Sequence, residues 1–167
     1  MITISTPVGP FTMTGNGLAV TAARFGNSDS WPRSLASQRA TSSSRLRAAG
    51  DLPRGDVPQS AVDAVKAYLD GDLTAIDTVP VAQSGTVYLE HCWDVLRTLD
   101  TPITYTEFAQ LTGKPGAVRA AAQGCARNQI ALLVPCHRVL RADGSLGGYR
   151  WGLDIKRWLL QHEANSY

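Results

Sequence analysis

The sequence lacks the features that mark secreted, membrane-spanning and zinc-binding proteins. Its three cysteines are an odd number without a CxxC pair, which argues against a disulfide framework and for a reducing compartment. Its three histidines are scattered and do not have the spacing of zinc ligands. There is no signal-peptide pattern, and no apolar run approaches the length of a membrane span. We therefore expect a cytoplasmic protein that uses no metal or other cofactor and does not bind membranes.

The net charge is also small, because the chain has 16 basic and 14 acidic side chains. A net charge of +2 does not by itself indicate a nucleic-acid partner. The distribution is more informative, since no acidic residue lies between Glu107 and Asp143. The basic residues in this interval are Lys114, Arg119, Arg127, Arg138 and Arg141. The stretch is either a solvated face or, as we favour, a surface that faces a polyanion.

With 167 residues, of which 44% are hydrophobic, the chain fits one domain or two small ones that share a core. Alternating residues and a Gly-Asn-Gly turn predict a β-hairpin in residues 1–25. Residues 26–58 are rich in Ser, Arg, Gly and Pro and predict a long loop. Ser60 is expected to cap a helix that ends at Gly71.

The second half of the sequence has mainly helical patterns. Apolar residues at helical spacing predict a helix over residues 86–99. Thr104 and Glu107 have the spacing of a capping box, which opens a short second helix. After a turn with Gly and Pro, residues 116–127 predict a third helix of mostly small side chains. Two short helices joined by a tight turn are typical of a helix-turn-helix, but an ordinary helical hairpin has the same pattern.

The last helix is predicted over residues 155–164, with Asp154 as its cap. A projection at about 100° per residue divides it into an inward stripe and an outward face. The stripe contains Ile155, Trp158, Leu159 and His162. The outward face contains Lys156, Arg157 and Gln161. Glu163 lies at the edge of the stripe, where a carboxylate is either a surface group or in position to orient a buried imidazole.

Residues 134–139, which read VPCHRV, carry the strongest chemical signal. A cysteine reacts as its thiolate, so a nucleophilic cysteine needs a base or a positive charge close by. Cys136 has both types of group as its next two residues, His137 and Arg138. The pair alone is compatible with a hydrolase, a redox site or another activated thiol.

Five motifs in a fixed order and spacing give the chain a family resemblance. They are Thr104-Tyr105, Asn128, Pro135 to Val139, Gly148-Tyr149 and Leu159 to Glu163. In these motifs the chain resembles the O6-alkylguanine-DNA alkyltransferases, which are suicide DNA-repair proteins. The resemblance is strong over residues 86–164 and weaker at Thr6–Pro10 and Ala67–Gly71. It implies an α+β fold, with a small ribonuclease H-like α/β subdomain in residues 1–81 and a helical, winged helix-turn-helix domain in residues 82–167.

The resemblance also implies a reaction and its catalytic residues. Cys136 is the nucleophile that takes the alkyl group, mainly methyl, from guanine O6 and keeps it as a thioether. His137 acts through a water as the base, Glu163 orients the imidazole, and Asn128 bridges parts of the site. Tyr105 donates a hydrogen bond to the departing guanine and so stabilises its negative charge.

Double-stranded DNA, bound through its minor groove by a monomer, is the partner that the resemblance implies. The alkylated nucleotide has to flip out of the duplex to reach a buried sulfur, and Arg119 then fills its place in the stack. The other residues expected at the DNA are Thr104, Ala120, Arg127 and Arg138. The residues expected around the flipped base are Tyr149, Trp151, Gly147 and Val139.

The chain departs from the family pattern at Trp151, where some members have a small residue. We therefore expect a narrow pocket that accepts methyl better than benzyl. Three alternatives are a non-catalytic alkyltransferase-like lesion-binding protein, a helix-turn-helix regulator and a cysteine hydrolase. The first would lack Cys136, the second would not need Cys136, His137 and Glu163, and the third would turn over repeatedly.

Overall fold

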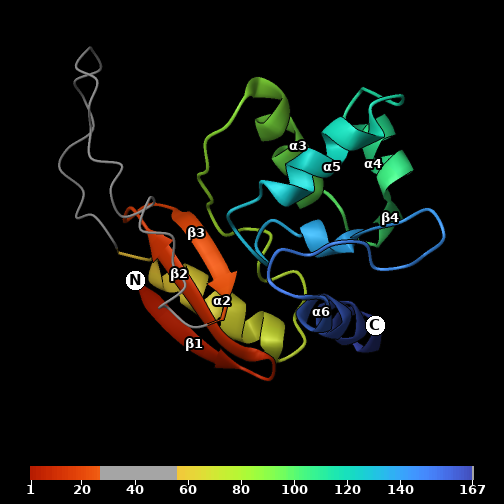
Figure 1. Cartoon of the computed structure of the whole chain (residues 1–167). Coiled ribbons are helices and arrows are strands. Elements are labelled where there is room, and N and C mark those ends of the chain that lie inside the picture. Colours follow the sequence, from red (N-terminus) through yellow and green to blue (C-terminus); the bar gives the residue numbers. More distant parts are fainter. Residues whose placement is uncertain (27–55, 167) are drawn as a thin grey trace, which may run out of the picture.

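The computed structural model describes residues 1–26 and 56–166. Most of the loop predicted over residues 26–58 lies outside these described residues. The described chain forms a three-stranded sheet with one helix beside it, followed by a larger helical part (Figure 1). Buried side chains from both parts belong to one hydrophobic core, so the two parts are packed together as a mixed α and β structure.

The sheet consists of β1 (Ile2–Thr6), β2 (Gly9–Gly15) and β3 (Val20–Phe25), which are antiparallel in the order β1-β2-β3. The first turn uses Gly9 at a φ of 106°, a left-handed backbone conformation that glycine adopts at little cost. The hairpin predicted over residues 1–25 is confirmed as β2 and β3, and β1 adds a third strand.

Helix α2 (Gln59–Leu69) lies beside the sheet and contributes a buried face of small and apolar residues (Figure 1). The prediction that Ser60 caps this helix is wrong. The helix begins at Gln59, two residues before the start that a Ser60 cap predicts, and no side chain caps it. Proline has a fixed φ that already suits a helix start. Gly71, at a φ of 107°, ends the helical segment as predicted.

The helical part contains α3 (Val87–Arg97), α4 (Tyr105–Leu111), α5 (Val118–Ala126) and α6 (Leu153–Asn165). The predicted capping box at the start of α4 is confirmed. The Thr104 hydroxyl accepts from the Glu107 backbone N–H at 3.2 Å, and the Glu107 carboxylate accepts from the Thr104 N–H at 2.7 Å. Helix α5 packs against both α3 and α4, so the predicted pair of short helices is present.

Two strand pairings hold the segment around Cys136, one within the helical part and one to the three-stranded sheet. β4 (Ile103–Thr104) pairs in parallel with β5 (Val139–Leu140), which joins the start of α4 to the stretch that contains Cys136. The edge of β3 pairs with a second segment, because the Ala23 N–H donates to the Gln129 carbonyl at 3.0 Å. The segment that leads to Cys136 is therefore held from both sides.

Helix α6 differs from its prediction in its cap and in its buried face. It follows Gly152, whose φ is 112°, and Asp154 lies inside its first turn, 2.8 Å from Arg157. The fully buried residues of the helix are Lys156, Leu159 and Glu163. The prediction that Lys156 lies on the outward face is wrong. The buried face of the helix includes charged residues that a hydrophobicity pattern assigns to solvent.

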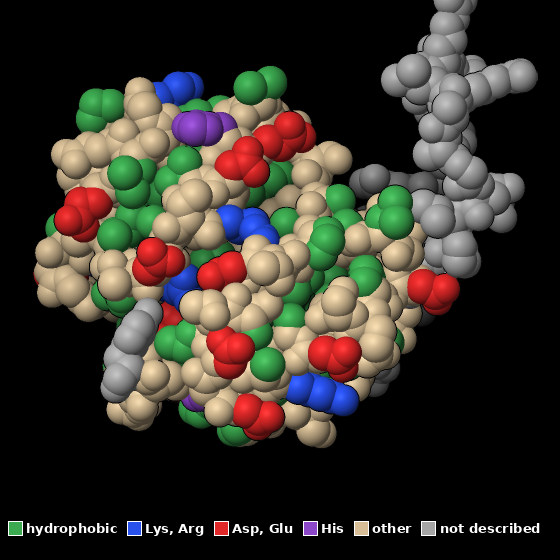
Figure 2. Space-filling model, turned by 180° about the vertical axis from the view of Figure 1, so that it is seen from behind, with side chains coloured by type: hydrophobic (Ala, Val, Ile, Leu, Met, Phe, Trp, Pro, Cys, Tyr) green, Lys and Arg blue, Asp and Glu red, His purple; other side chains and the backbone are tan. Residues whose placement is uncertain are grey.

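The surface seen from behind mixes side chains of every type. Figure 2 shows acidic groups spread over this face, with a few Lys and Arg among them and no gathering of basic side chains. Within residues 1–26 and 56–166, no helix is both long enough and apolar enough to cross a membrane.

Candidate active site

Cys136 begins a short 3-10 helix, η2 (Cys136–Arg138), directly after the buried run of residues 130–134. Within this run Leu132 has a φ of 67°, in a region that non-glycine residues seldom occupy. Such a conformation costs on the order of 1–3 kcal/mol and persists only where the surrounding packing holds it. The same packing fixes Cys136, which is only 5% exposed.

Asn128 ties this run together through both ends of its side-chain amide. Its Nδ2 donates to the carbonyls of Ile130 and Val134, at 3.2 and 2.9 Å, and lies 3.3 Å from the Cys136 sulfur. Its Oδ1 accepts from the Ile130 N–H at 3.0 Å and from Gln83 at 3.1 Å. Asn128 therefore connects the backbone before Cys136 to the reactive sulfur, which is the bridging position expected for it.

The Cys136 sulfur is a thiol at neutral pH. Burial raises the pKa of Cys136 to about 11, although the Asn128 hydrogen bond and the positive charge of Lys156 lower it. A thiol is a weak nucleophile. Reaction at this sulfur therefore requires a base that removes its proton.

The neighbouring His137 is buried and has one nitrogen available for that purpose. Its Nε2 lies 2.8 Å from Glu163 Oε1. A carboxylate accepts, so Nε2 carries the hydrogen and Nδ1 is the basic nitrogen. Among the described residues, nothing forms a hydrogen bond with Nδ1. Burial lowers the pKa of His137, against the opposing effect of Glu163, so the imidazole is neutral at neutral pH.

Glu163 is shared between His137 and Arg138. Arg138 Nε donates to Oε2 and Nη2 donates to Oε1, both at 3.0 Å, and Nη1 donates to the Leu99 carbonyl. Burial would raise the pKa of Glu163, but His137 and Arg138 lower it to about 2. The carboxylate is therefore charged and can stabilise a protonated His137. Arg138 itself is only 4% exposed, so its prediction as a DNA contact is wrong, because its guanidinium is paired inside the protein.

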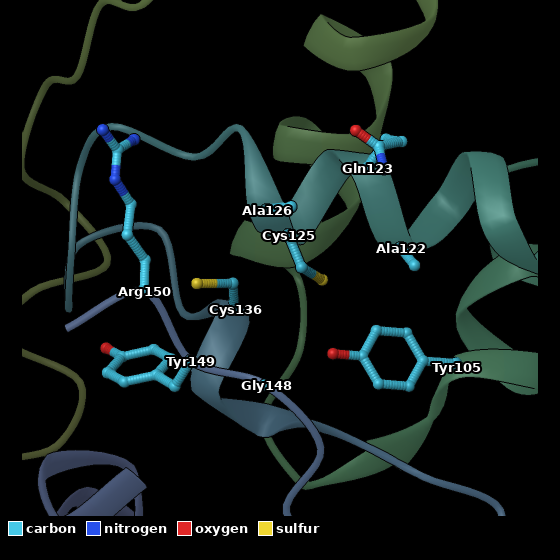
Figure 3. Close-up of a pocket in the computed structure, with 9 residues that line it drawn as sticks. All are labelled: Tyr105, Ala122, Gln123, Cys125, Ala126, Cys136, Gly148, Tyr149 and Arg150. Carbon is cyan, nitrogen blue, oxygen red and sulfur yellow. The ribbon is translucent and has the colours of Figure 1, made fainter. Parts of the chain in front are cut away.

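A cavity of about 430 Å³ opens beside Cys136. Figure 3 shows Tyr105 and Tyr149 on opposite sides of the Cys136 side chain, with the Tyr105 hydroxyl directed into the space between them. Burial raises the pKa of Tyr105 to about 12, with smaller contributions from nearby cysteines. Tyr105 therefore keeps its hydrogen at neutral pH and can donate it to a bound group.

Of the four residues expected around the base, only Tyr149 lines this cavity. Trp151 packs against Tyr149, with ring centroids 5.1 Å apart in an edge-on arrangement. Gly147 lies against Tyr105, where a Cβ atom would come within 3.3 Å of the Tyr105 ring. Val139 belongs to the buried core.

Sequence reasoning missed most of the wall that α5 provides. The other lining residues are Ala122, Gln123, Cys125, Ala126, Gly148 and Arg150. Four of them lie on one face of α5, so helical spacing could group them in the sequence. This grouping identifies a cavity wall only when α5 is known to pack beside Cys136, which no local pattern indicates.

The residues expected at the DNA fall into three groups. Arg119 and Arg127 are exposed on or just after α5, and Ala120 is partly buried. Thr104 is occupied in capping α4. Arg138 is the buried residue described above. The exposed part of the predicted basic surface is thus carried mainly by α5 and its flanking turns.

Lys156 is buried, although its sequence pattern placed it in solvent. Its ammonium group donates to the Leu146 carbonyl, to the Val139 carbonyl at 2.7 Å and to the Gly148 carbonyl at 3.4 Å. Burial lowers the pKa of Lys156, whereas the nearby cysteines Cys136 and Cys125 raise it. Lys156 therefore joins α6 to β5 and to the loop that carries Tyr149.

Cys136 lines the cavity and the adjacent His137 is hydrogen-bonded to Glu163, which is the arrangement of a site that uses a cysteine as its nucleophile. No cluster of metal-ligating side chains is found within residues 1–26 and 56–166. A family model described as the DNA binding domain of 6-O-methylguanine DNA methyltransferase matches residues 89–165. This chain belongs to the methylated-DNA–protein-cysteine methyltransferase family.

Individual relatives differ in how much of their length the chain spans. A methylated-DNA–protein-cysteine methyltransferase of Mycobacterium tuberculosis is 36% identical over 165 residues, or 98% of this chain and 91% of the relative. The bifunctional transcriptional activator/DNA repair enzyme Ada of Escherichia coli is 41% identical over 121 residues, which are 71% of this chain but 34% of Ada. The chain likewise spans 64% of a related methyltransferase from Shigella flexneri.

Solved structures agree with this assignment. The crystal structure of Mycobacterium tuberculosis OGT in complex with DNA has a TM-score of 0.75 at 32% identity. The match covers 98% of this chain and 92% of that one.

Proposed function

We propose that this protein repairs DNA by taking the alkyl group from O6-alkylguanine, mainly O6-methylguanine, onto Cys136. The reaction occurs once per protein molecule, because the thioether that forms is not cleaved again. The observation that carries the proposal is the placement of the Cys136 thiol at a cavity, next to a neutral His137 that is hydrogen-bonded to a charged Glu163. Relatives named methylated-DNA–protein-cysteine methyltransferase support it.

The step is a displacement at carbon. The bond between guanine O6 and the alkyl carbon breaks while the bond from Cys136 Sγ to that carbon forms. The thiol proton passes through one water to His137 Nδ1, and Glu163 stabilises the imidazolium. The guanine keeps the electron pair of the broken bond, and its negative charge is stabilised by the Tyr105 hydroxyl.

Alkylated guanine in double-stranded DNA is the proposed substrate, bound through the minor groove by a monomer. A paired base cannot reach Cys136, which is 5% exposed, so the nucleotide flips into the cavity. Arg119 is proposed to fill the gap in the base stack, and Thr104, Ala120 and Arg127 to lie along the backbone. The solved complex of Mycobacterium tuberculosis OGT with DNA supports DNA as the partner.

The same proposal covers the organisation of the chain. Residues 1–81 would form a ribonuclease H-like subdomain, and residues 82–167 a winged helix-turn-helix domain with α4 and α5 as its helix pair. The acid-poor stretch around α5 supports a DNA-facing role for this domain. The cytoplasm is the proposed location.

Peptide mapping by mass spectrometry tests the proposal. The protein is mixed with duplex DNA that contains O6-methylguanine and then digested. We expect one added methyl group on the peptide with Cys136 and none in Cys136→Ala. Binding of the modified DNA without any adduct would instead support a lesion-binding protein or a regulator, and release of product over many cycles would support a hydrolase.

A further inference from the structure

The hydroxyl of Tyr68 reaches the carboxylate at the centre of the site from a distant part of the chain. Tyr68 is the last fully buried residue of α2, 95 residues before Glu163 in the sequence. Its hydroxyl donates to Glu163 Oε1 at 2.8 Å. The matched family model begins at residue 89 and therefore does not include this helix.

Three donors meet at Glu163 Oε1. They are the Tyr68 hydroxyl at 2.8 Å, His137 Nε2 at 2.8 Å and Arg138 Nη2 at 3.0 Å. The proposed chemistry explains the His137 contact, and Arg138 supplies the counter-charge. The proposed chemistry gives the Tyr68 contact no role. All of these groups are nevertheless buried, and all three donors form hydrogen bonds with the same oxygen.

Tyr68 is held firmly enough to act on this oxygen. His162 Nε2 lies 2.8 Å from the Tyr68 carbonyl oxygen, and the two rings are 5.2 Å apart. The His162 ring in turn stacks on Trp158, with centroids 4.9 Å apart and planes within 7°. The His162 contacts thereby join α2 to α6 next to the Tyr68–Glu163 hydrogen bond.

We propose that Tyr68 is a positioning residue that holds Glu163 and sets how strongly this carboxylate supports protonation of His137. The proposal rests on the proposed function of Cys136 and His137. A hydrogen bond from Tyr68 withdraws electron density from Oε1, so the carboxylate attracts the His137 proton less strongly. The hydrogen bond from Tyr68 therefore lowers the pKa of His137. His137 stays neutral, with Nδ1 able to accept a proton, down to a lower pH than it would without Tyr68.

Substitution of Tyr68 by Phe removes none of the other charged and titratable groups around this pair. Those that face it from the surrounding elements are Arg138, Cys136, Lys156, Tyr149, His162 and, through Arg138, Asp77. Burial and the negative charge of Glu163 raise the pKa of Tyr68 far above its ordinary value. Tyr68 is therefore a neutral donor throughout the working pH range.

Tyr68→Phe is the test, because it removes one hydroxyl and keeps the ring. The rate constant for methyl transfer from duplex O6-methylguanine is measured from pH 5 to 9. We expect the acid limb of the profile to move up by about one pH unit, which lowers the rate up to about tenfold on that limb. The rate above the limb should stay within about threefold of wild type, because Arg138 still holds Glu163.

Tyr88→Phe is the matched control, since this half-buried tyrosine hydrogen-bonds Thr112 and does not touch the site. It should leave the acid limb where it is. A Tyr68→Phe protein that folds and has the wild-type pH profile, with or without a lower melting temperature, would overturn the proposal.

A second measurement separates this inference from the proposed function. Nitrogen-15 NMR of the histidine rings reports the protonation of His137 in the absence of DNA. We expect His137 to titrate at a higher pH in Tyr68→Phe than in wild type. If this shift occurs in a protein that transfers no methyl group, the proposed function fails and the role of Tyr68 in setting His137 stands. An unchanged titration contradicts the role of Tyr68.

Discussion

At the scale of single residues, the reactivity of Cys136 depends on neighbours that keep it protonated at rest. Burial keeps the sulfur a thiol, and His137 Nδ1 is the nearby basic nitrogen without a partner among the described residues. The proposed reaction is therefore selective for a bound substrate, because a buried thiol reacts only when a substrate fills the cavity and the base removes the thiol proton. A surface thiolate would instead react with any alkylating agent.

The size of the accepted alkyl group is tested by Trp151→Gly. Trp151 supports the cavity wall by packing edge-on against Tyr149. Removing it lets Tyr149 move outward, so reactivity toward O6-benzylguanine should rise about tenfold or more. The rate of methyl transfer from O6-methylguanine in DNA, measured on the same variant, is the reference. An unchanged rate with O6-benzylguanine would mean that Trp151 does not limit the pocket.

Lys156→Met tests the buried ammonium group. Methionine fills similar space but leaves three backbone carbonyls, at Val139, Leu146 and Gly148, without their donor. An unsatisfied buried acceptor costs about 1–3 kcal/mol, so we expect the free energy of unfolding in urea to fall by about 2–4 kcal/mol. Arg157→Met, on the exposed face of the same helix, should change it little. Equal effects of the two substitutions would contradict the inward role of Lys156.

Only some residues of the site can be predicted from the sequence. Cys136 and His137 are adjacent in the chain, and Asn128 and Glu163 have characteristic spacings, so the sequence indicates all four. Tyr68, Arg138 and Lys156 could not be assigned in this way. Their positions depend on tertiary packing that carries polar groups inward, whereas a periodic pattern assumes that charged side chains face water.

At the scale of elements, α5 is the part that connects the cavity to the proposed DNA surface. One of its faces lines the cavity, and the exposed residues beside it include Arg119 and Arg127. Its small residues were consistent with either close packing or a groove. The structure shows close packing on one side, because Gly124 lies against Cys92 of α3 and its carbonyl accepts from Trp93 Nε1 at 2.9 Å.

Gly124→Ala tests this close approach. A Cβ atom at Gly124 would lie 2.7 Å from Cys92 Cβ, which cannot rotate away, so α3 and α5 must separate. Overpacking of this kind costs about 1–3 kcal/mol, more than the helix propensity of about 1 kcal/mol that alanine adds. We expect a net loss of stability in thermal unfolding. Gly116→Ala, where nothing lies within 4 Å, should be tolerated. Greater stability of Gly124→Ala would contradict the packing described.

Element boundaries were the easier part of the prediction. The helix expected over residues 86–99 is found at Val87–Arg97, and the capping box places the start of α4 correctly. The errors at Ser60 and Asp154 have one cause. Both residues are good caps, but Pro58 and Gly152 precede them and fix the chain where each helix begins.

At the scale of the whole molecule, Glu163 joins α2, η2 and α6 in one buried network. This network has a pH dependence with a definite sign. The pKa of Glu163 falls from its ordinary 4.5 to about 2 on folding. The unfolded chain therefore takes up a proton first as the pH decreases, and stability is lost from about pH 4.5 down to about pH 2.

The expected loss from Glu163 is about 3 kcal/mol across that window, at about 1.36 kcal/mol for each unit of pKa shift. Urea unfolding at several pH values measures it. Glu163→Gln should be less stable at pH 5 and should lose less of its remaining stability on acidification. The same dependence on pH in both proteins would show that other carboxylates control acid unfolding.

Cys136 is proposed to accept one alkyl group and to react no further. Duplex DNA with a radiolabelled methyl group on guanine O6 is added in large excess, and label on the protein and loss from the DNA are followed together. We expect both to stop at one methyl group per protein molecule, with none transferred to Cys136→Ser. Loss from the DNA that continues past one equivalent, or that persists in Cys136→Ser, would contradict it.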